Sequence, residues 1–263
     1  LYFSLHMRGI LRIVSTAGIL LALIVPGESV AQDPEAFALT NSLKIRLAYV
    51  LSGDAEVDEV SRAGLIGLTT MLSRRTAAEL ASPQGINPAV DELAFFPLLY
   101  WPVLPSAAAS GVAGERVRAY LRNGGTILFD TRDQNADGGG FRRLAWQLSL
   151  PPLVPVDANH VLSRAFYLLR KFPGRWAGGG LWVEKAGERV NDGVSPVVAG
   201  NHDWAAAWAM DDNQRPMFAV VPGGERQREM AYRFGINLVM YTLTGNYKAD
   251  QVHMPAIIRR LGQ

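Results

Sequence analysis

The sequence contains no cysteine among its 263 residues. This absence excludes disulfides, thiolate zinc sites and a cysteine nucleophile, and it is compatible with an exported bacterial chain. An excess of charge of one sign is also lacking, because 26 basic residues stand against 24 acidic ones. Lys and Arg form no block, whereas a nucleic-acid surface would cluster them on one face. The sequence therefore predicts no nucleic-acid partner.

The N-terminal residues carry a targeting pattern. Residues 1–6 have the character of a tag remnant, and we expect the natural chain to begin at residue 7. Residues 7–31 combine a basic start, small residues before a cleavage point and an apolar stretch shorter than the about 20 residues that span a bilayer. They predict a signal peptide, or an uncleaved membrane anchor, and a periplasmic or inner-membrane-anchored location. Residues 32–42 are then a linker.

Residues 43–263 are predicted to form a single α/β domain, since 49% of the chain is hydrophobic and can bury one large core. Alternating apolar residues predict a strand over residues 43–53, and apolar residues at helical spacing predict a helix over Val57–Arg75. Residues 82–88 contain proline and glycine and are expected to form a loop. The apolar residues 93–103 are of strand type.

Two prolines, Pro97 and Pro102, are expected to restrict that strand to an edge or an irregular position. A helix over Gly114–Asn123 is followed by a short apolar strand over Thr126–Phe129, which is the second half of a parallel crossover unit. Three strands joined by helices predict a three-layer α/β sandwich with a mostly parallel, flavodoxin-like sheet.

The second half is less regular. A helix is expected over His160–Lys171, followed by four short strand-like runs, LWVE, SPVVAG, WAAAWAM and PMFAVV, separated by turn residues. A long helix is expected from Gly224 to about Leu243, and a last short helix after Pro255.

The stretch GGTILFDTRDQ carries the candidate site, because its apolar strand leads directly into charged residues. Ligands of open parallel sheets bind at the carboxyl ends of the strands, where residues 52–54 and 130–133 are expected to converge. One hypothesis is a divalent cation held by Asp54, Asp130 and Asp133. Another is an anion held by Arg132. The interpretation that we favour is an ion-pair network in which Arg132 and the aspartates fix the loop.

A polar cluster interrupts the later apolar runs at residues 201–204. A nucleophilic set of Thr131, His202 and Asp203 is an alternative, although adjacent residues on a strand point to opposite sides. The candidate binding residues are Ser52, Gly53, Asp54, Asp130, Thr131, Arg132, Asp133, Asn201, Asp203 and Trp204.

Six stretches together resemble a bacterial family known only as a domain of unknown function, DUF4159. They are LAYVLSGDAEVDEVSRAGL, DELAFFPLLYWPV, RAYLRNGGTILFDTRDQ, HVLSRAFYLLRKFPGR, DGVSPVVAGNHDWAAAW and REMAYRFGINLVMYTLTGNYKADQVH. In that family the domain often follows membrane-spanning segments in larger chains related to aerotolerance proteins. The resemblance implies partners among envelope or membrane proteins.

The same family resembles the class I glutamine amidotransferase-like fold. The match is carried by AYLRNGGTILFDTRDQ, in which Thr131 takes the place of that fold's catalytic cysteine and Arg132-Asp133 replaces the glycine that follows it. A threonine is a poor nucleophile without an activating base. We therefore expect no glutaminase activity, and a non-catalytic module that binds a small molecule or a partner. The alternative is a hydrolase-like enzyme, assisted by a divalent metal, in the same crevice.

Overall fold

The computed structural model describes residues 44–133, 138–157, 160–185 and 195–261. The expected tag remnant (1–6), signal peptide or anchor (7–31) and linker (32–42) lie outside the described residues. Within the part that is described, no helix is both long enough and apolar enough to span a membrane.

One seven-stranded sheet forms the centre of the domain, in the order β2-β1-β3-β4-β7-β6-β5. Its strands are β1 (Arg46–Val50), β2 (Ala81–Ile86), β3 (Leu98–Pro102), β4 (Thr126–Asp130), β5 (Leu153–Pro155), β6 (Leu181–Glu184) and β7 (Val197–Gly200). The first five strands of that order pair in parallel, and β6 and β5 extend the sheet in antiparallel pairs. The order 2-1-3-4 followed by β7 is the flavodoxin-like arrangement.

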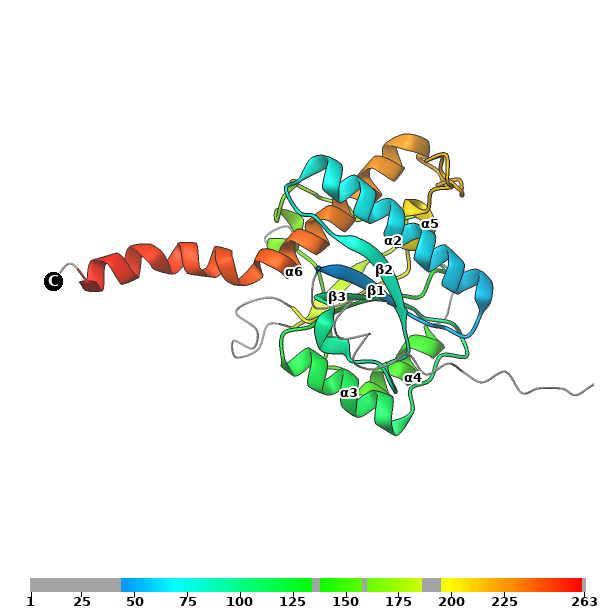
Figure 1. Cartoon of the computed structure of the whole chain (residues 1–263), viewed down its shortest axis with the longest axis horizontal. Coiled ribbons are helices and arrows are strands. Elements are labelled where there is room, and N and C mark those ends of the chain that lie inside the picture. The colour runs from blue at the N-terminus through cyan, green and yellow to red at the C-terminus, as the bar shows by residue number, and fades with distance from the viewer. Residues whose placement is uncertain (1–43, 134–137, 158–159, 186–194, 262–263) are drawn as a thin grey trace, which may run out of the picture. The chain divides into compact units, whose positions relative to one another are not determined.

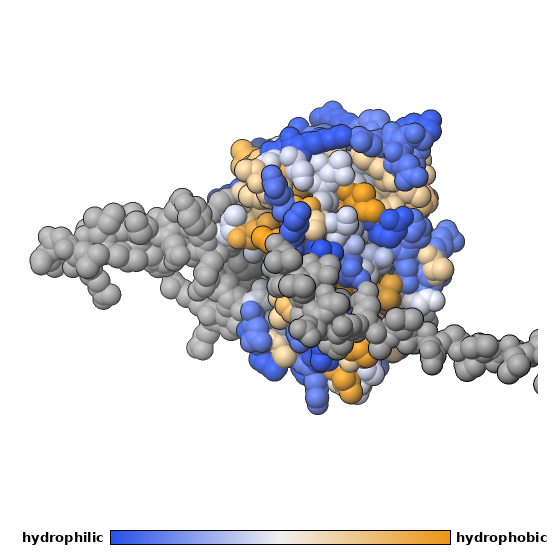
Figure 2. Space-filling model, viewed as in Figure 1, coloured by the Kyte–Doolittle hydropathy of each residue, from blue (hydrophilic) through white to orange (hydrophobic). Residues whose placement is uncertain are grey.

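Helices cover both faces of the sheet, which confirms the three-layer sandwich (Figure 1). One layer contains α2 (Ala55–Arg75), α5 (Trp204–Trp208) and α6 (Gly224–Leu261), and the other contains α3 (Gly111–Arg122) and α4 (Gly139–Leu148). Each layer has its own apolar cluster against the sheet. The connection from α5 to α6 is largely exposed, and Figure 2 shows hydrophilic residues along that edge of the domain.

The helix α2 after β1 and the crossover from β3 through α3 to β4 agree with the sequence prediction. All five residues of β4 are buried, as its wholly apolar start indicates. In α2 the buried residues recur at helical spacing, and two of them, Gly64 and Gly67, let the helix approach the backbone of α5 so closely that a Cβ atom would collide with it.

The expected loop at residues 82–88 was wrong, because β2 pairs in parallel with β1 there. The register gains one residue in β2 between the pairs Arg46–Ala81 and Ala48–Gln84, which is a bulge at Ser82 and Pro83. A bulge on an edge strand tolerates a proline, since no ladder hydrogen bond is required from it.

The edge position expected for the strand after Pro97 was also wrong. β3 lies between β1 and β4 and is fully buried. Pro97 precedes the strand and Pro102 is its last residue, so neither removes a donor from the middle of the ladder.

The helix expected over His160–Lys171 is not formed. Only the 3-10 turn η2 (Val161–Ser163) is present, as is a similar turn η1 (Leu93–Phe95) before β3. The buried side chain of Asn237 explains this difference. It accepts hydrogen bonds from the amides of Phe166 and Tyr167 and donates to the carbonyls of Leu162 and Tyr167. These backbone groups are thereby satisfied by α6 rather than by a local helix.

Two of the four strand-like runs are not strands. WAAAWAM contains the helix α5, and PMFAVV takes part only in isolated bridges. A long helix ending near Leu243 and a separate short helix after Pro255 were expected, but one helix, α6, continues to Leu261 through Pro255.

Asn237→Ala tests the role of this side chain. The change leaves four backbone groups without their partner, and each unsatisfied buried group costs about 1–3 kcal/mol. We expect the free energy of unfolding, measured by urea denaturation, to fall by at least about 3 kcal/mol. Asn213→Ala, at an exposed position, is the control and should change it by less than about 0.5 kcal/mol. Equal effects of the two changes would contradict the prediction.

Candidate functional site

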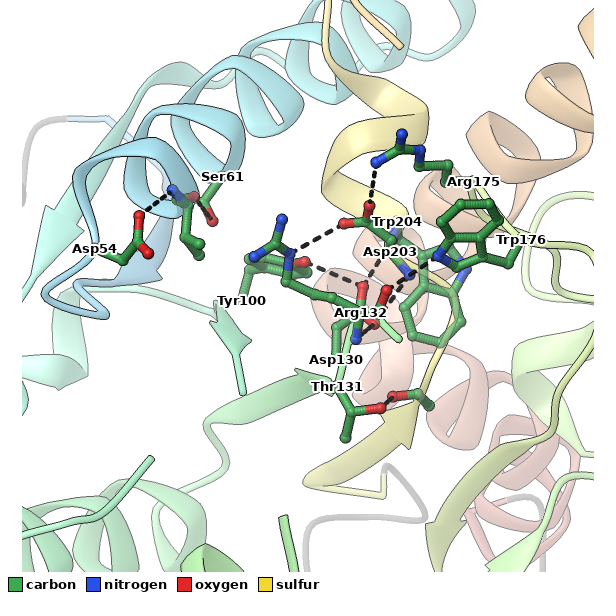
Figure 3. Close-up of polar contacts among 12 residues, drawn as sticks. Asp54, Ser61, Tyr100, Asp130, Thr131, Arg132, Arg175, Trp176, Asp203 and Trp204 are labelled. Atoms are coloured by element: carbon green, nitrogen blue, oxygen red, sulfur yellow. Dashed lines mark hydrogen bonds and ion pairs between the residues drawn. The ribbon is translucent and has the colours of Figure 1, made fainter. Parts of the chain in front are cut away.

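The carboxylate of Asp130 lies at the end of β4 with no exposed surface. Its Oδ1 accepts hydrogen bonds from the backbone amides of Arg132 at 3.0 Å and Asp203 at 3.1 Å. Its Oδ2 accepts from the amide of Trp204 at 2.7 Å and from the Tyr100 hydroxyl at 3.0 Å. One side chain therefore joins β3 to the segments that follow β4 and β7 (Figure 3).

Burial and, to a smaller extent, the nearby charge of Asp203 raise the pKa of Asp130 to about 6, although hydrogen bonds from three backbone amides act in the opposite direction. Asp130 is therefore ionised at neutral pH. Because its side chain is fully buried, Asp130 fixes the surrounding backbone and cannot contact a ligand.

Above Asp130 lies an ion-pair group in which Asp203 holds two arginines. The Asp203 carboxylate is 3% exposed and contacts Arg132 Nε at 3.1 Å and Arg175 Nη1 at 3.3 Å. Burial is the largest single influence on the pKa of Arg132 and lowers it, but the interactions with Asp203, Tyr100 and Asp130 together outweigh burial, and the pKa is raised. Arg132 is thus paired, as we favoured from the sequence, but its partner comes from the start of α5.

Backbone geometry places these groups. Arg132 and Asp203 both have positive φ values, of 62° and 52°. The Trp176 indole donates to the Arg132 carbonyl at 3.0 Å, and the Arg175 guanidinium lies 4.8 Å from the centre of the Trp176 ring. Trp176 therefore orients both arginines, because its ring stacks with the Arg175 guanidinium and its indole is hydrogen-bonded to the backbone of Arg132.

A cavity of about 300 Å³ opens beside this group. It is lined by Val103, Leu104, Pro105, Thr131, Arg132, Asp133, Gly138, Gly139, Gly140, Phe141, Arg175, Trp176 and Asp203. The glycines begin α4, whose N-cap Gly138 has a positive φ of 71° and offers no side-chain acceptor to the first turn. Adding a Cβ atom to Gly140 would bring it against the Leu104 carbonyl, so α4 starts in close contact with the segment after β3.

Residues 52–54 do not join this cavity. Asp54 caps α2 by accepting from the amides of Glu56 and Val57, and Ser52 donates to Asp58 at 2.7 Å. Ser52 lines a separate cavity of about 290 Å³, and Gly53 occupies the turn with φ of 83°. The described residues contain no group of three or more His, Asp or Glu side chains suited to a metal ion, so the expected aspartate set is not brought together.

The polar cluster at residues 201–204 is mostly buried. His202 is 2% exposed, its Nδ1 faces the Trp176 carbonyl at 3.2 Å, and burial lowers its pKa. The Thr131 hydroxyl faces the Gly200 carbonyl at 3.5 Å, and both Asp203 oxygens contact arginines. The structure thus shows no hydrogen-bonded chain from Thr131 through His202 to Asp203. Trp204 is fully buried and donates to the Phe172 carbonyl.

The position of Arg175 in the site was not predicted from the sequence, and neither were the roles of Trp176 and the glycines of α4. The signal was present in FPGRWAGGG and DGGGF, where an arginine, a tryptophan and a phenylalanine stand within or beside glycine-rich runs. Such runs are typical of loops in which a backbone approaches a ligand or another segment. Nothing local, however, relates Arg175 to Asp203.

The fold and site define a three-layer α/β domain with a ligand-sized cavity at the carboxyl ends of its strands. The chain belongs to the family described as Domain of unknown function (DUF4159), whose model matches residues 46–243. A search of curated proteins finds no match.

The buried Asp130 makes stability depend on pH. Its pKa of about 6 in the folded state exceeds the value of about 3.9 in model peptides, so the folded protein holds this proton more tightly than the unfolded chain. The Asp130 contribution to stability is greatest below about pH 4 and declines as pH rises to about 6.

Asp130→Asn removes this titration. We expect the free energy of unfolding of the native protein, measured relative to that of the variant, to fall by about 2 kcal/mol between pH 4 and pH 7. Urea denaturation at each pH measures it, with Asp212→Asn at an exposed position as the matched control. Parallel pH curves for the native protein and Asp130→Asn would show the prediction to be wrong.

Proposed function

We propose that this domain is a non-catalytic binding module that holds the anionic group of a small ligand. The observation that carries the proposal is the pair of arginines, Arg132 and Arg175, positioned beside a cavity by one buried aspartate. A carboxylate or a phosphate is the group that paired guanidinium donors recognise best.

The geometry leaves donors for such a group. Arg132 uses Nε for Asp203, and its two terminal nitrogens have no hydrogen bond to the described residues. Arg175 donates from Nη1 to Asp203. Its guanidinium lies over the rings of Trp176 and Phe218, which hold the guanidinium plane in position. Both side chains are partly exposed, at 21% and 32%. Because the arginines are already ordered, ligand binding loses less side-chain entropy.

The start of α4 adds to this preference. Its first turn lines the same cavity and has no side-chain cap, and the N-terminal end of a helix carries partial positive charge. Asp133 is exposed and lines the same cavity, so it adds a negative charge to the lining. It favours ligands whose anionic group lies deeper, toward Arg132 and Arg175.

The resemblance to an amidotransferase-like scaffold supports the location of the site and not its chemistry. Thr131 takes the position of the nucleophile, and its hydroxyl faces a backbone carbonyl rather than a basic side chain. A threonine needs an activating base or amine. The hydrolase alternative would gain support from a turnover activity that Thr131→Val abolishes.

The place of action that we propose is the cell envelope, with export directed by residues 7–31 and envelope or membrane proteins as partners. The support is the targeting pattern of the sequence. Cell fractionation of the tagged protein tests it, and a purely cytoplasmic pool would contradict it.

Arginine variants test anion binding. We expect Arg132→Gln and Arg175→Gln each to weaken binding of inorganic phosphate and of acetate by roughly tenfold to a hundredfold, since a hydrogen bond to a charged group contributes about 1.5–3 kcal/mol. Isothermal titration calorimetry measures the affinities. Arg132→Lys keeps the charge but loses the paired donors, so its loss should be intermediate.

Arg142→Gln is the matched control, because Arg142 lies on α4 next to the cavity but does not line it. It removes the same charge and should leave both affinities within about twofold, the scale of a screened surface charge. Thermal melting of each variant confirms that it is folded. Absence of phosphate and acetate binding in the native protein, or equal losses in Arg142→Gln, would refute the proposal.

A further inference from the structure

We propose that the ligand is an amphipathic anion, with its charged head beside Arg132 and Arg175 and its apolar body in an adjoining cavity. This inference rests on the proposed anion binding and adds the chemistry of the rest of the ligand. The second cavity measures about 460 Å³. It shares Thr131, Gly138 and Phe141 with the arginine-lined cavity, so the two adjoin along the ends of β4 and β7.

The two cavities differ in chemistry. The larger one is bounded by apolar side chains from three elements or their flanks, namely Phe141, Ala145, Pro151, Leu153 and Trp182. None of its lining residues is charged, and the only polar side chains among them belong to Thr131 and Asn201. The smaller cavity contains both arginines. Charge is therefore concentrated at one end of the combined space, which gives a bound ligand one orientation.

The apolar wall is firmly placed. Phe141 packs against the buried ring of Phe129, with ring centres 5.6 Å apart. Trp182 belongs to β6, which pairs in antiparallel with β5 on one side and β7 on the other. Gly138 stands at the junction of the two cavities, where an added Cβ atom would meet nothing within 4 Å. Gly138 is therefore shared by the two cavities without a side chain that separates them.

Size agrees with this assignment. Small-molecule sites occupy about 300–1,000 Å³ and are mostly apolar with a few converging polar groups. The arginine-lined cavity alone lies at the lower limit and holds little more than a head group, whereas the added apolar cavity accommodates a hydrocarbon or aromatic body. Burial of such a body supplies affinity that a small anion lacks.

A series of saturated monocarboxylates from acetate to hexanoate tests the inference by isothermal titration calorimetry with the whole protein. We expect affinity to rise by up to about fourfold for each CH₂ group that becomes buried. Ala145→Phe fills the apolar cavity and Leu153→Asn makes its wall polar, and these side chains come from different elements. Both variants should flatten the chain-length dependence and leave the acetate affinity unchanged.

Ala77→Phe, at an exposed position away from both cavities, is the control and should retain the chain-length dependence. If acetate binds through the arginines but hexanoate binds no tighter, the amphipathic ligand is refuted while anion binding stands. If hexanoate binding is insensitive to Ala145→Phe and Leu153→Asn, the assigned cavity is wrong. If no carboxylate binds but phosphate does, this inference fails and anion binding stands, whereas if neither binds, the proposed function fails as well.

Discussion

The buried carboxylate of Asp130 is the constraint on which the rest of the site depends. A buried carboxylate is stable only when donors surround it, and here four donors from three segments do so. Two of them are the amides that open α5, so the position of that short helix follows from Asp130. Together with the ion pair between Arg132 and Asp203, this acceptor joins the segments after β4 and β7.

Asp203 connects this anchor to the cavity. In its left-handed conformation it donates its amide to Asp130 and directs its carboxylate to Arg132 and Arg175. Asp203 therefore links the buried carboxylate of Asp130 to the two arginines that line the cavity. Asp130 and Trp204 are buried and position the backbone, whereas Asp203, the two arginines and Trp176 line the cavity.

Elements whose signal is local were predicted well from sequence. The helix α2 and the strand β4 have enough residues, at helical spacing or in one apolar run, to be recognised by themselves. β2 was missed because an edge strand is held by backbone pairing with β1, which a bulge at Pro83 permits. The absent helix at residues 160–171 depends on Asn237, about 70 residues away in the chain.

In the candidate site, too, some features follow from local sequence and others depend on tertiary contacts. Sequence alone determined the class of fold, the strand end at which the site lies and several of its residues, because hydrophobic periodicity and the chemistry of Asp130 to Asp133 are local properties. Tertiary structure alone decided which aspartate is buried, which arginines share Asp203 and which residues enclose the cavities. These relations join residues that are 28 to 74 positions apart. No periodicity encodes such pairings, since they arise only when the loops meet above the sheet.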